Sequence, residues 1–452
     1  MTVSQAATPE PEVVTKTAAP VKTVVERPSE FTVENKLTGR DLLKSVGFPK
    51  TIVAPMVDQS ELAWRLISRK YGADLCYTPM FHARLFGEDK RYREDQFGPL
   101  DGDANVDRPL IVQFCANDPE ELLKAAKYVV GRCDAVDLNL GCPQGIAKKG
   151  KYGAFLMEDW DLIYRLINIL HTKLEIPVTA KIRIYETKEK TLEYAKMVLS
   201  AGAQFLTVHG RTREMKGQLT GLADWSYIRY VRDNLPPDTV IFANGNVLYS
   251  EDIDRSLEAT KADAVMSAES NLYNPGVFNV NKPGIDDQFP RVDKLLREYF
   301  ETAKSTPGNA SQTSMKSHFF KVLQSFLPKH LNIRNAIGPI RKGQYDQFED
   351  VVKQVEEIVE GIYEKVNKGE LEDKVITLPD GYKSVPYWRC QPYFRVVNGV
   401  LSNGKRKADV DPEAAQRKKE AKLEKEKAAA ALASLSSDGP QPTGDEAPEP
   451  SN

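Results

Sequence analysis

The chain has 452 residues, and its 62 Lys and Arg residues nearly balance its 64 Asp and Glu residues, which gives a formal net charge of -2. A hydrophobic share of 41% can fill a large core and excludes a collagen-like, coiled-coil or wholly disordered chain. The absence of an 18-residue apolar run and of a secretory signal predicts a soluble protein of the cytoplasm, the nucleus or both.

The five cysteines are an odd number and contain no CxxC pair. This pattern argues against a disulfide framework and a zinc ribbon, so we expect reduced thiols and no metal site. The N-terminal segment up to Pro28 contains no Trp, Tyr, Phe or Leu, and we expect residues 1–35 to be disordered because they cannot bury enough apolar surface.

Residues 50–285 show eight short apolar segments that alternate with helical patterns such as Pro119–Gly131. The predicted strands are Thr51–Pro55, Leu75–Pro79, Leu110–Cys115, Ala135–Leu140, Val178–Arg183, Phe205–Gly210, Val240–Gly245 and Ala264–Glu269. Eight strand and helix repeats predict an α/β fold, a (β/α)8 TIM barrel. An open doubly wound sheet stays as the alternative, because periodicity alone does not prove closure.

Residues 292–368 have a purely helical pattern, which predicts a small all-helical domain after the barrel. Within it, the window Thr302–Tyr345 contains seven basic residues and no acidic one. A solvated surface is the simple explanation, but the missing acids make a nucleic-acid-binding surface at least as good a hypothesis. The helix predicted at Glu349–Lys365 is acidic, and we expect it to face away from this surface.

The segment 380–396 mixes aromatic side chains with Arg389 and Arg395. It could stack on bases, but packing against the folded domains is the preferred interpretation. Residues 403–452 are rich in Lys, Glu and Ala and then in Ser, Pro and acids, so we expect a disordered charged tail. The basic cluster Lys405–Lys407 resembles a nuclear import signal, although such runs are weakly specific.

Candidate chemistry collects where the predicted strands end, because reactive groups of a parallel barrel lie at the C-terminal ends of its strands. The residues at or near these exits are Pro55, Met56, Val57, Gln113, Asn139, Cys142, Lys181, Arg183, His209, Arg211, Asn244, Gly245, Asn246, Ala268 and Glu269. Polar groups inside apolar strands are costly without a partner, so Gln113, Lys181 and His209 predict a shared polar ligand.

The loops after the last two strands usually bind phosphate in such barrels, which suits Asn244–Asn246 and Ala268–Glu269. Flavin mononucleotide (FMN) fits this arrangement, and a sugar phosphate or pyridoxal phosphate fits the residue types almost as well. Cys142, in a Gly-Cys-Pro turn after a strand, is the candidate proton donor. Lys149 and its neighbouring lysines are close enough along the chain to meet a phosphate.

Five motifs together resemble the tRNA-dihydrouridine synthases. They are APM at Ala54–Met56, NLGCP at Asn139–Pro143, KIR at Lys181–Arg183, VHGRTR at Val208–Arg213 and NGN at Asn244–Asn246. Further segments, HFFK at His318–Lys321 and WRCQPYFR at Trp388–Arg395, resemble the eukaryotic branch that modifies tRNA positions 16 and 17.

The resemblance implies FMN-dependent reduction of a D-loop uridine to 5,6-dihydrouridine, with NADPH or NADH as reductant and Cys142 as proton donor to C5. By the family pattern, Pro55, Met56, Val57, Gln113, Lys181 and His209 surround the flavin, while Asn244, Gly245, Asn246, Ala268 and Glu269 hold its phosphate. Many relatives have Gly-Arg where this chain has Ala268–Glu269, so either backbone N–H groups suffice for the phosphate or the basic contact comes from elsewhere. Expected tRNA contacts are Asn139, Lys149, Arg183, Arg211, Lys316, Lys321 and Arg334.

Three further expectations complete the sequence interpretation. The protein should be monomeric, and a chain ended after about Ser305 should still oxidise NADPH but bind tRNA weakly. A reductase of a small pyrimidine, similar to dihydroorotate dehydrogenase, is one alternative function. A non-catalytic RNA-binding barrel is the other, and it would have no need of Cys142 or Lys181.

Overall fold

The computed structural model describes residues 36–306, 308–379, 381–394, 396–397 and 400–401. The predictions for residues 1–35 and 403–452, including the Lys405 cluster, therefore lie outside the described residues. The described residues up to Tyr393 belong to one compact unit, and a second unit starts at Phe394. In the second unit, strands β12 (Val396–Val397) and β13 (Val400–Leu401) pair antiparallel.

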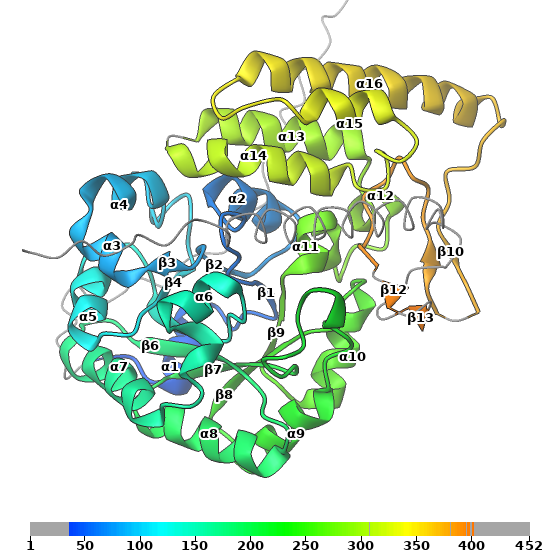
Figure 1. Ribbon diagram of the computed structural model, residues 1–452. Coiled ribbons are helices and arrows are strands. Elements are labelled where there is room, and N and C mark those ends of the chain that lie inside the picture. Colours follow the sequence, from blue (N-terminus) through cyan, green and yellow to red (C-terminus); the bar gives the residue numbers. More distant parts are fainter. Residues whose placement is uncertain (1–35, 307, 380, 395, 398–399, 402–452) are drawn as a thin grey trace, which may run out of the picture. The chain divides into compact units, whose positions relative to one another are not determined.

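Eight parallel strands close into a barrel within the first unit (Figure 1). They are β1 (Thr51–Val53), β2 (Leu75–Tyr77), β4 (Leu110–Cys115), β5 (Ala135–Leu140), β6 (Val178–Arg183), β7 (Phe205–His209), β8 (Val240–Asn244) and β9 (Ala264–Ser267). Each pairs with the next strand of this series, and β9 pairs with β1 to close the circle. Closure confirms the predicted (β/α)8 fold and excludes the open sheet.

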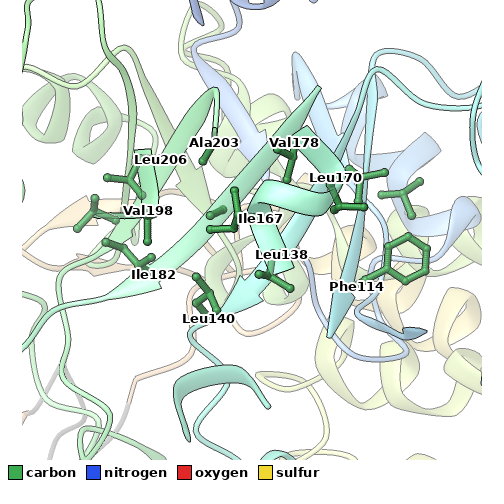
Figure 2. Close-up of a cluster of buried hydrophobic side chains, with 14 of the residues drawn as sticks. Phe114, Leu138, Leu140, Ile167, Leu170, Val178, Ile182, Val198, Ala203 and Leu206 are labelled. Atoms are coloured by element: carbon green, nitrogen blue, oxygen red, sulfur yellow. The ribbon is translucent and has the colours of Figure 1, made fainter. Parts of the chain in front are cut away.

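Successive side chains of each strand face opposite sides of the barrel wall, as the two-residue period of a strand requires. In β5, Val136, Leu138 and Leu140 belong to the core that the wall shares with the outer helices. Figure 2 shows part of this outer layer, where Leu138 and Leu140 lie near Ile167 and Leu170 of α7. The alternate β5 positions are therefore left to the barrel interior.

The outer layer of the barrel consists of helices that follow the strands. They are α2 (Leu62–Lys70), α5 (Pro119–Lys127), α7 (Trp160–Lys173), α8 (Lys188–Ser200), α9 (Trp225–Asp233), α10 (Glu251–Thr260) and the short α11 (Glu269–Tyr273). The helix start predicted at Pro119 is confirmed, because the Asp118 carboxylate accepts a hydrogen bond from the Glu121 N–H at 2.9 Å.

Several shorter elements complete the barrel. They are α1 (Gly39–Ser45), β3 (Phe81–His82), α3 (Ala83–Glu88), α4 (Lys90–Gln96), α6 (Gly145–Gly150), α12 (Ile285–Gln288) and the 3-10 turns Gly153–Leu156, Gly217–Leu219 and Pro275–Phe278. Leu42 and Leu43 of α1 share a buried cluster with interior residues such as Ile52 and Phe242. Because α1 leads into the start of β1, it closes the N-terminal end of the barrel and leaves the other end for the site.

Four helices form a layer beside the barrel: α13 (Val292–Ser305), α14 (Asn309–Val322), α15 (Leu331–Ile337) and α16 (Tyr345–Asn367). Their core is not separate from the barrel, because Trp64 and Ile67 of α2 belong to the same buried cluster as Tyr299, Phe319 and Phe326. Figure 1 shows α14 close to α2 and α11. Barrel and helical layer therefore fold as one unit.

The aromatic and arginine segment packs against both parts of this unit. Trp388, Arg389 and Cys390 are 6%, 2% and 0% exposed. The Arg389 guanidinium donates hydrogen bonds to Asp373, to the Tyr363 hydroxyl and to Asp286. This burial agrees with the predicted packing role and leaves no face of these three side chains for base stacking.

One expectation about charge is wrong. The acidic helix was expected to face away from the basic window, but Glu349 of α16 forms ion pairs with Lys304 at 3.7 Å and with Arg297 at 2.9 Å. The acid-free window of the sequence therefore acquires an acidic partner in three dimensions.

No helix among the described residues is long and apolar enough to span a membrane.

Candidate active site

The polar residues predicted at the strand exits meet at one end of the barrel. Across the sheet, Asn139 is opposite Lys181, Arg183 is opposite His209, and His209 is opposite Asn244. Four neighbouring strands, β5 to β8, thus place their polar groups side by side. The parallel register explains this convergence, because all four strands end at the same edge.

A chain of hydrogen bonds runs through the barrel interior to the Cys142 turn. The Gln113 amide donates to the Asp137 carboxylate at 2.8 Å, and the Asn139 amide donates to the Gln113 side-chain oxygen at 2.8 Å. The Asn139 side-chain oxygen then accepts from the N–H groups of Gly141 and Cys142, at 3.1 and 2.8 Å. The predicted flavin and substrate residues Gln113 and Asn139 are therefore connected to the predicted acid.

Lys181 projects into this end of the barrel. Its ammonium group forms no hydrogen bond or ion pair with another described residue. Burial, together with the charge of Arg183, lowers the pKa of Lys181 to about 7, although Asp137 and Cys142 act in the opposite direction. A half-buried amine with no hydrogen-bond or ion-pair partner among the described residues fits an external anionic or carbonyl ligand.

His209 faces the same space in its neutral form. Burial and the neighbouring charges of Lys181, Arg183 and Arg211 hold the pKa of His209 well below its ordinary value. The His209 Nε2 lies 2.9 Å from a guanidinium nitrogen of Arg211. Because arginine can only donate, Nε2 accepts this hydrogen bond and Nδ1 carries the proton. His209 can therefore offer an Nδ1–H donor to a ligand.

Arg183 and Arg211, which were predicted to contact RNA, are each 7% exposed. Arg183 donates to the carbonyl oxygens of Gly141 and Thr212, both at 2.7 Å. Arg211 donates to the Gly221 carbonyl at 2.9 Å and to the Asn246 side-chain oxygen at 3.1 Å. These contacts favour a role in holding the loops around the site over the predicted contact with RNA phosphates.

The exits of β8 and β9 form the predicted phosphate region. Gly245 has a φ of 119°, and a Cβ atom there would lie 2.6 Å from the Cβ of Ala223, so no other residue fits. The N–H groups of Gly245, Asn246 and Val247 donate no hydrogen bond to another described residue. The side chains of Asn244 and Asn246 are occupied by the carbonyl oxygens of Met266 and Ala223. Backbone donors, rather than these amides, are thus available to an anion.

The last two predicted phosphate residues follow β9. Ala268 precedes the first turn of α11, and Glu269 is the first residue of this helix. Lys321 of α14 is near enough for the Glu269 charge to counteract the lowering of the Lys321 pKa by burial. An acidic side chain therefore stands at the start of α11, and the helical layer brings a lysine near it.

The Cys142 turn is held from several sides. Its carbonyl oxygen accepts a hydrogen bond from the Ala154 N–H at 3.1 Å, and the Lys216 ammonium donates to the Pro143 carbonyl at 2.8 Å. Gly153 approaches so closely that a Cβ atom there would lie 2.8 Å from the Cys142 oxygen. Cys142 is partly exposed, whereas the four other cysteines are buried. It is thus the cysteine that a substrate can reach.

The loop after β1 carries the predicted flavin-lining residues Pro55, Met56 and Val57, and Val57 is 49% exposed. Helix α14 holds the end of this loop. The Ser314 hydroxyl donates to the Asp58 carbonyl, and His318 Nε2 lies 3.0 Å from the Glu61 carboxylate. Glu61 and His318 are 1% and 0% exposed. The helical layer thus contacts the loop expected to line the flavin.

The basic residues predicted to bind tRNA differ in their surroundings. Lys316 donates to the Gly338 carbonyl at 2.8 Å and Lys321 to the Ser317 hydroxyl at 3.0 Å, whereas Arg334 is exposed. Lys149 is exposed on α6. None of these four side chains forms an ion pair with another described residue. The charges of Lys149, Lys316 and Arg334 are therefore available to an anionic partner, whereas Lys321 lies near Glu269.

Sequence reasoning missed Asp137, Thr179, Glu61 and the pairing partner of Glu61, His318. A signal for Asp137 was present, because an acidic residue lies inside the apolar segment AVDLNL, two residues before Asn139 and hence on the same face. Glu61 and His318 gave no such signal, since their meeting depends on how α14 packs.

Comparisons with known proteins agree with this geometry. The profile of the family described as "Dihydrouridine synthase (Dus)" matches residues 52–369. The tRNA-dihydrouridine(16/17) synthase [NAD(P)(+)] of Saccharomyces cerevisiae is 59% identical over 86% of this chain and 96% of its own length. The protein of the same name from Schizosaccharomyces pombe is 48% identical over 83% of this chain and 95% of its own length. The similarly named protein of Rattus norvegicus is 41% identical over 78% of this chain and 75% of its own length.

Proposed function

The chain belongs to the dihydrouridine synthase family, and on this premise we propose that it reduces uridines 16 and 17 of tRNA to 5,6-dihydrouridine. NADPH or NADH is the source of the two electrons. The observation that carries this proposal is the meeting of Cys142, Lys181 and His209 at the C-terminal end of one barrel, in a chain so similar to its yeast relatives along almost their whole length.

The donor set fits FMN. Lys181 has no hydrogen-bond partner in the part of the chain that the structure describes, and His209 presents an Nδ1–H. Gln113 retains a second amide hydrogen beyond the one given to Asp137. These donors suit the carbonyl and nitrogen edge of a flavin ring. The free N–H groups at Gly245 and Asn246 suit its phosphate. Pro55, Met56 and Val57 would line the ring from the β1 loop, and Ala268 with Glu269 would border the phosphate.

Cys142 supplies the proton of the proposed reaction. When bound, FMN provides the hydride that adds to C6 of the uracil ring. The Cys142 thiol gives its proton to C5, which completes the saturation of the C5–C6 bond. The turn that carries Cys142 is fixed through Asn139, Arg183 and Lys216, so the thiol is preorganised for this transfer.

The surface around the barrel mouth suits single-stranded RNA. Exposed apolar side chains lie on the segments that follow β1, β5 and β7, and they are Val57 (49%), Ile146 (66%), Leu219 (71%) and Leu222 (60%). Apolar side chains of this kind pack against bases that leave a stacked helix. The basic residues Lys149, Lys316 and Arg334, which form no ion pair with a described residue, would contact phosphates, with an affinity that falls as salt rises. The target uridines lie in a loop, where unstacking costs little.

Replacement of the thiol tests the proposal. Cys142→Ala should retain bound flavin and its reduction by NADPH but lose about 100-fold or more in dihydrouridine formation. The measurement is mass spectrometry of tRNA after incubation with enzyme and NADPH. Cys133→Ala, which removes a buried thiol outside the site, is the control and should keep normal turnover. Normal turnover by Cys142→Ala would refute the assignment of the acid.

The substrate class needs its own test. Cells that lack this protein should lose dihydrouridine at tRNA positions 16 and 17 and retain it elsewhere, as mapped by primer extension. Purified enzyme should reduce tRNA and leave free uridine and orotate unchanged. Comparable turnover of a free pyrimidine would instead favour the small-pyrimidine reductase, and absence of flavin from the purified protein would favour the non-catalytic barrel.

A further inference from the structure

Asp137 is a carboxylate inside the barrel, and nothing in the proposed chemistry yet requires it. It is 0% exposed and lies on β5 between β4 and β6. One carboxylate oxygen accepts from the Thr179 hydroxyl at 2.6 Å, and the other accepts from the Gln113 amide at 2.8 Å. A buried carboxylate is costly even when each oxygen has a donor, so an apolar residue here would serve packing better.

The position of Asp137 gives the hydrogen-bond chain a direction. An ionised carboxylate only accepts, so Gln113 must turn its NH2 group towards Asp137 and its oxygen away. That oxygen can then receive the NH2 group of Asn139, which leaves the Asn139 oxygen facing the N–H groups of Gly141 and Cys142. A reversed Gln113 amide would set oxygen against oxygen at Asp137 and one NH2 group against another at Asn139.

We propose that Asp137 is a positioning residue for this reaction: through Gln113 and Asn139 it sets the orientation of the turn that carries the Cys142 thiol. The same contact orients the free Gln113 N–H towards the flavin edge. This inference rests on the proposed function for the role of Cys142, whereas the chain of contacts itself is independent of it.

Protonation of Asp137 should remove its control over the orientation of the Gln113 amide. Burial raises the pKa of Asp137 to about 6, while Thr179, Gln113 and the charge of Lys181 act in the opposite direction. The titratable groups that face Asp137 are Lys181 on β6 and Tyr77 on β2. A protonated Asp137 can donate to Gln113 and permit the reversed amide. We therefore expect kcat to fall as pH drops through about 6, with little change in KM for tRNA.

Two substitutions separate this role from simple packing. Asp137→Asn abolishes the ionised form, so kcat should be at least tenfold lower at pH 7 and should lose its dependence on the Asp137 ionisation. Thr179→Val removes a hydrogen bond that lowers the Asp137 pKa, so it should move the acidic limb of kcat to higher pH. Ser256→Ala is the control, because the Ser256 hydroxyl is also 0% exposed but lies on α10, away from Asp137, and forms no hydrogen bond with a described residue.

The measurements are kcat and KM for dihydrouridine formation between pH 5 and 9, the melting temperature at pH 8, and the rate at which iodoacetamide alkylates Cys142. Alkylation reports on Cys142 selectively, since the other cysteines are buried. We expect Asp137→Asn to change the alkylation rate at least threefold without a lower melting temperature, because ionisation of a carboxylate with a raised pKa is unfavourable to the fold at this pH.

Wild-type kcat, pH profile and alkylation rate in Asp137→Asn would overturn the inference. A lower melting temperature with these three values unchanged would also overturn it, since that result describes packing alone. If wild-type enzyme failed to modify tRNA, the proposed function would fall, while the alkylation rates would still decide whether Asp137 positions the Cys142 turn.

Discussion

At the scale of residues, the site combines basic side chains that differ in whether the surrounding protein already binds them. Arg183 and Arg211 are engaged by backbone carbonyl oxygens, so their charges are fixed parts of the wall. Lys181 has no such partner, and His209 is neutral because the surrounding charges and burial disfavour its protonation. Lys181 is therefore the group whose charge can respond when an anionic ligand enters.

This property predicts how FMN binding depends on pH. With a Lys181 pKa of about 7, the amine is largely neutral at pH 8 and must take up a proton to pair with an anionic ligand. FMN affinity should therefore fall as pH rises above about 7, by up to about tenfold per pH unit. The measurement is a fluorescence titration of FMN with flavin-free protein between pH 6 and 9.

The matched variants for this titration are two methionine substitutions. Lys181→Met should bind FMN more weakly at pH 6 and show a flat profile, whereas Lys196→Met, on the exposed face of α8, should behave like the unmodified chain. A pH dependence that survives in Lys181→Met would show that another group takes up the proton.

At the scale of elements, α14 connects the helical layer to the loop that follows β1. Ser314 and His318 contact Asp58 and Glu61, and the His318 ring stacks on Trp64 with centroids 4.3 Å apart. The Tyr299 hydroxyl of α13 donates to the other Glu61 oxygen at 3.0 Å. The contacts of Glu61 are buried and the Ser314 contact is partly buried, and all of them lie at the end of the segment expected to line the flavin. We therefore expect α14 to influence flavin retention as well as stability.

Removal of the His318 imidazole tests this connection. His318→Ala leaves the buried Glu61 carboxylate with Tyr299 as its remaining partner among these side chains, and loss of one partner of a buried pair costs about 3 kcal/mol of unfolding free energy. We also expect less FMN per purified chain. Urea unfolding and the flavin absorbance measure the two effects.

The control for this variant is Asn332→Ala, an exposed substitution on the neighbouring α15. It should leave both the unfolding free energy and the flavin content unchanged. Full flavin content in a destabilised His318→Ala would restrict α14 to a structural role and separate it from the flavin site.

At the scale of the whole molecule, the barrel and the helical layer share one core. Trp64 of the barrel is 0% exposed and lies among Tyr299, Phe319 and Phe326 of the helical layer. The buried Arg389 guanidinium adds ion pairs with Asp286 of the barrel and with Asp373, which follows α16. The expectation that the helices can be removed as a separate tRNA-binding module conflicts with this arrangement.

A chain ended after Ser305 should therefore not be a flavin enzyme that merely binds tRNA weakly. It exposes the apolar face of α2 and loses the Ser314 and His318 contacts to the β1 loop, so we expect aggregation or loss of FMN. The measurement is the soluble yield and flavin content of the shortened chain. A control that ends after Asn403 should retain both, and a soluble yellow 1–305 fragment that oxidises NADPH would contradict the prediction.

The sequence by itself determined the barrel and most of its chemistry. Strand and helix periods and the residue types at strand exits are local properties, so they located all eight strands, the Cys142 turn and the polar set around Lys181 and His209. The family resemblance, carried by short motifs, added the reaction. These features needed no knowledge of how distant segments pack.

Only the tertiary structure decided which residues are the hydrogen-bond partners of the buried polar side chains. The contacts of Asp137 depend on Gln113 and Thr179, which lie on the two neighbouring strands. Those of Arg183 depend on the carbonyl oxygens of Gly141 and Thr212. Glu61 and His318 meet across 257 positions of the chain. Hydrogen bonding and burial depend on which atoms are within about 3 Å in space, and a linear pattern carries that information only when the partners are close in sequence.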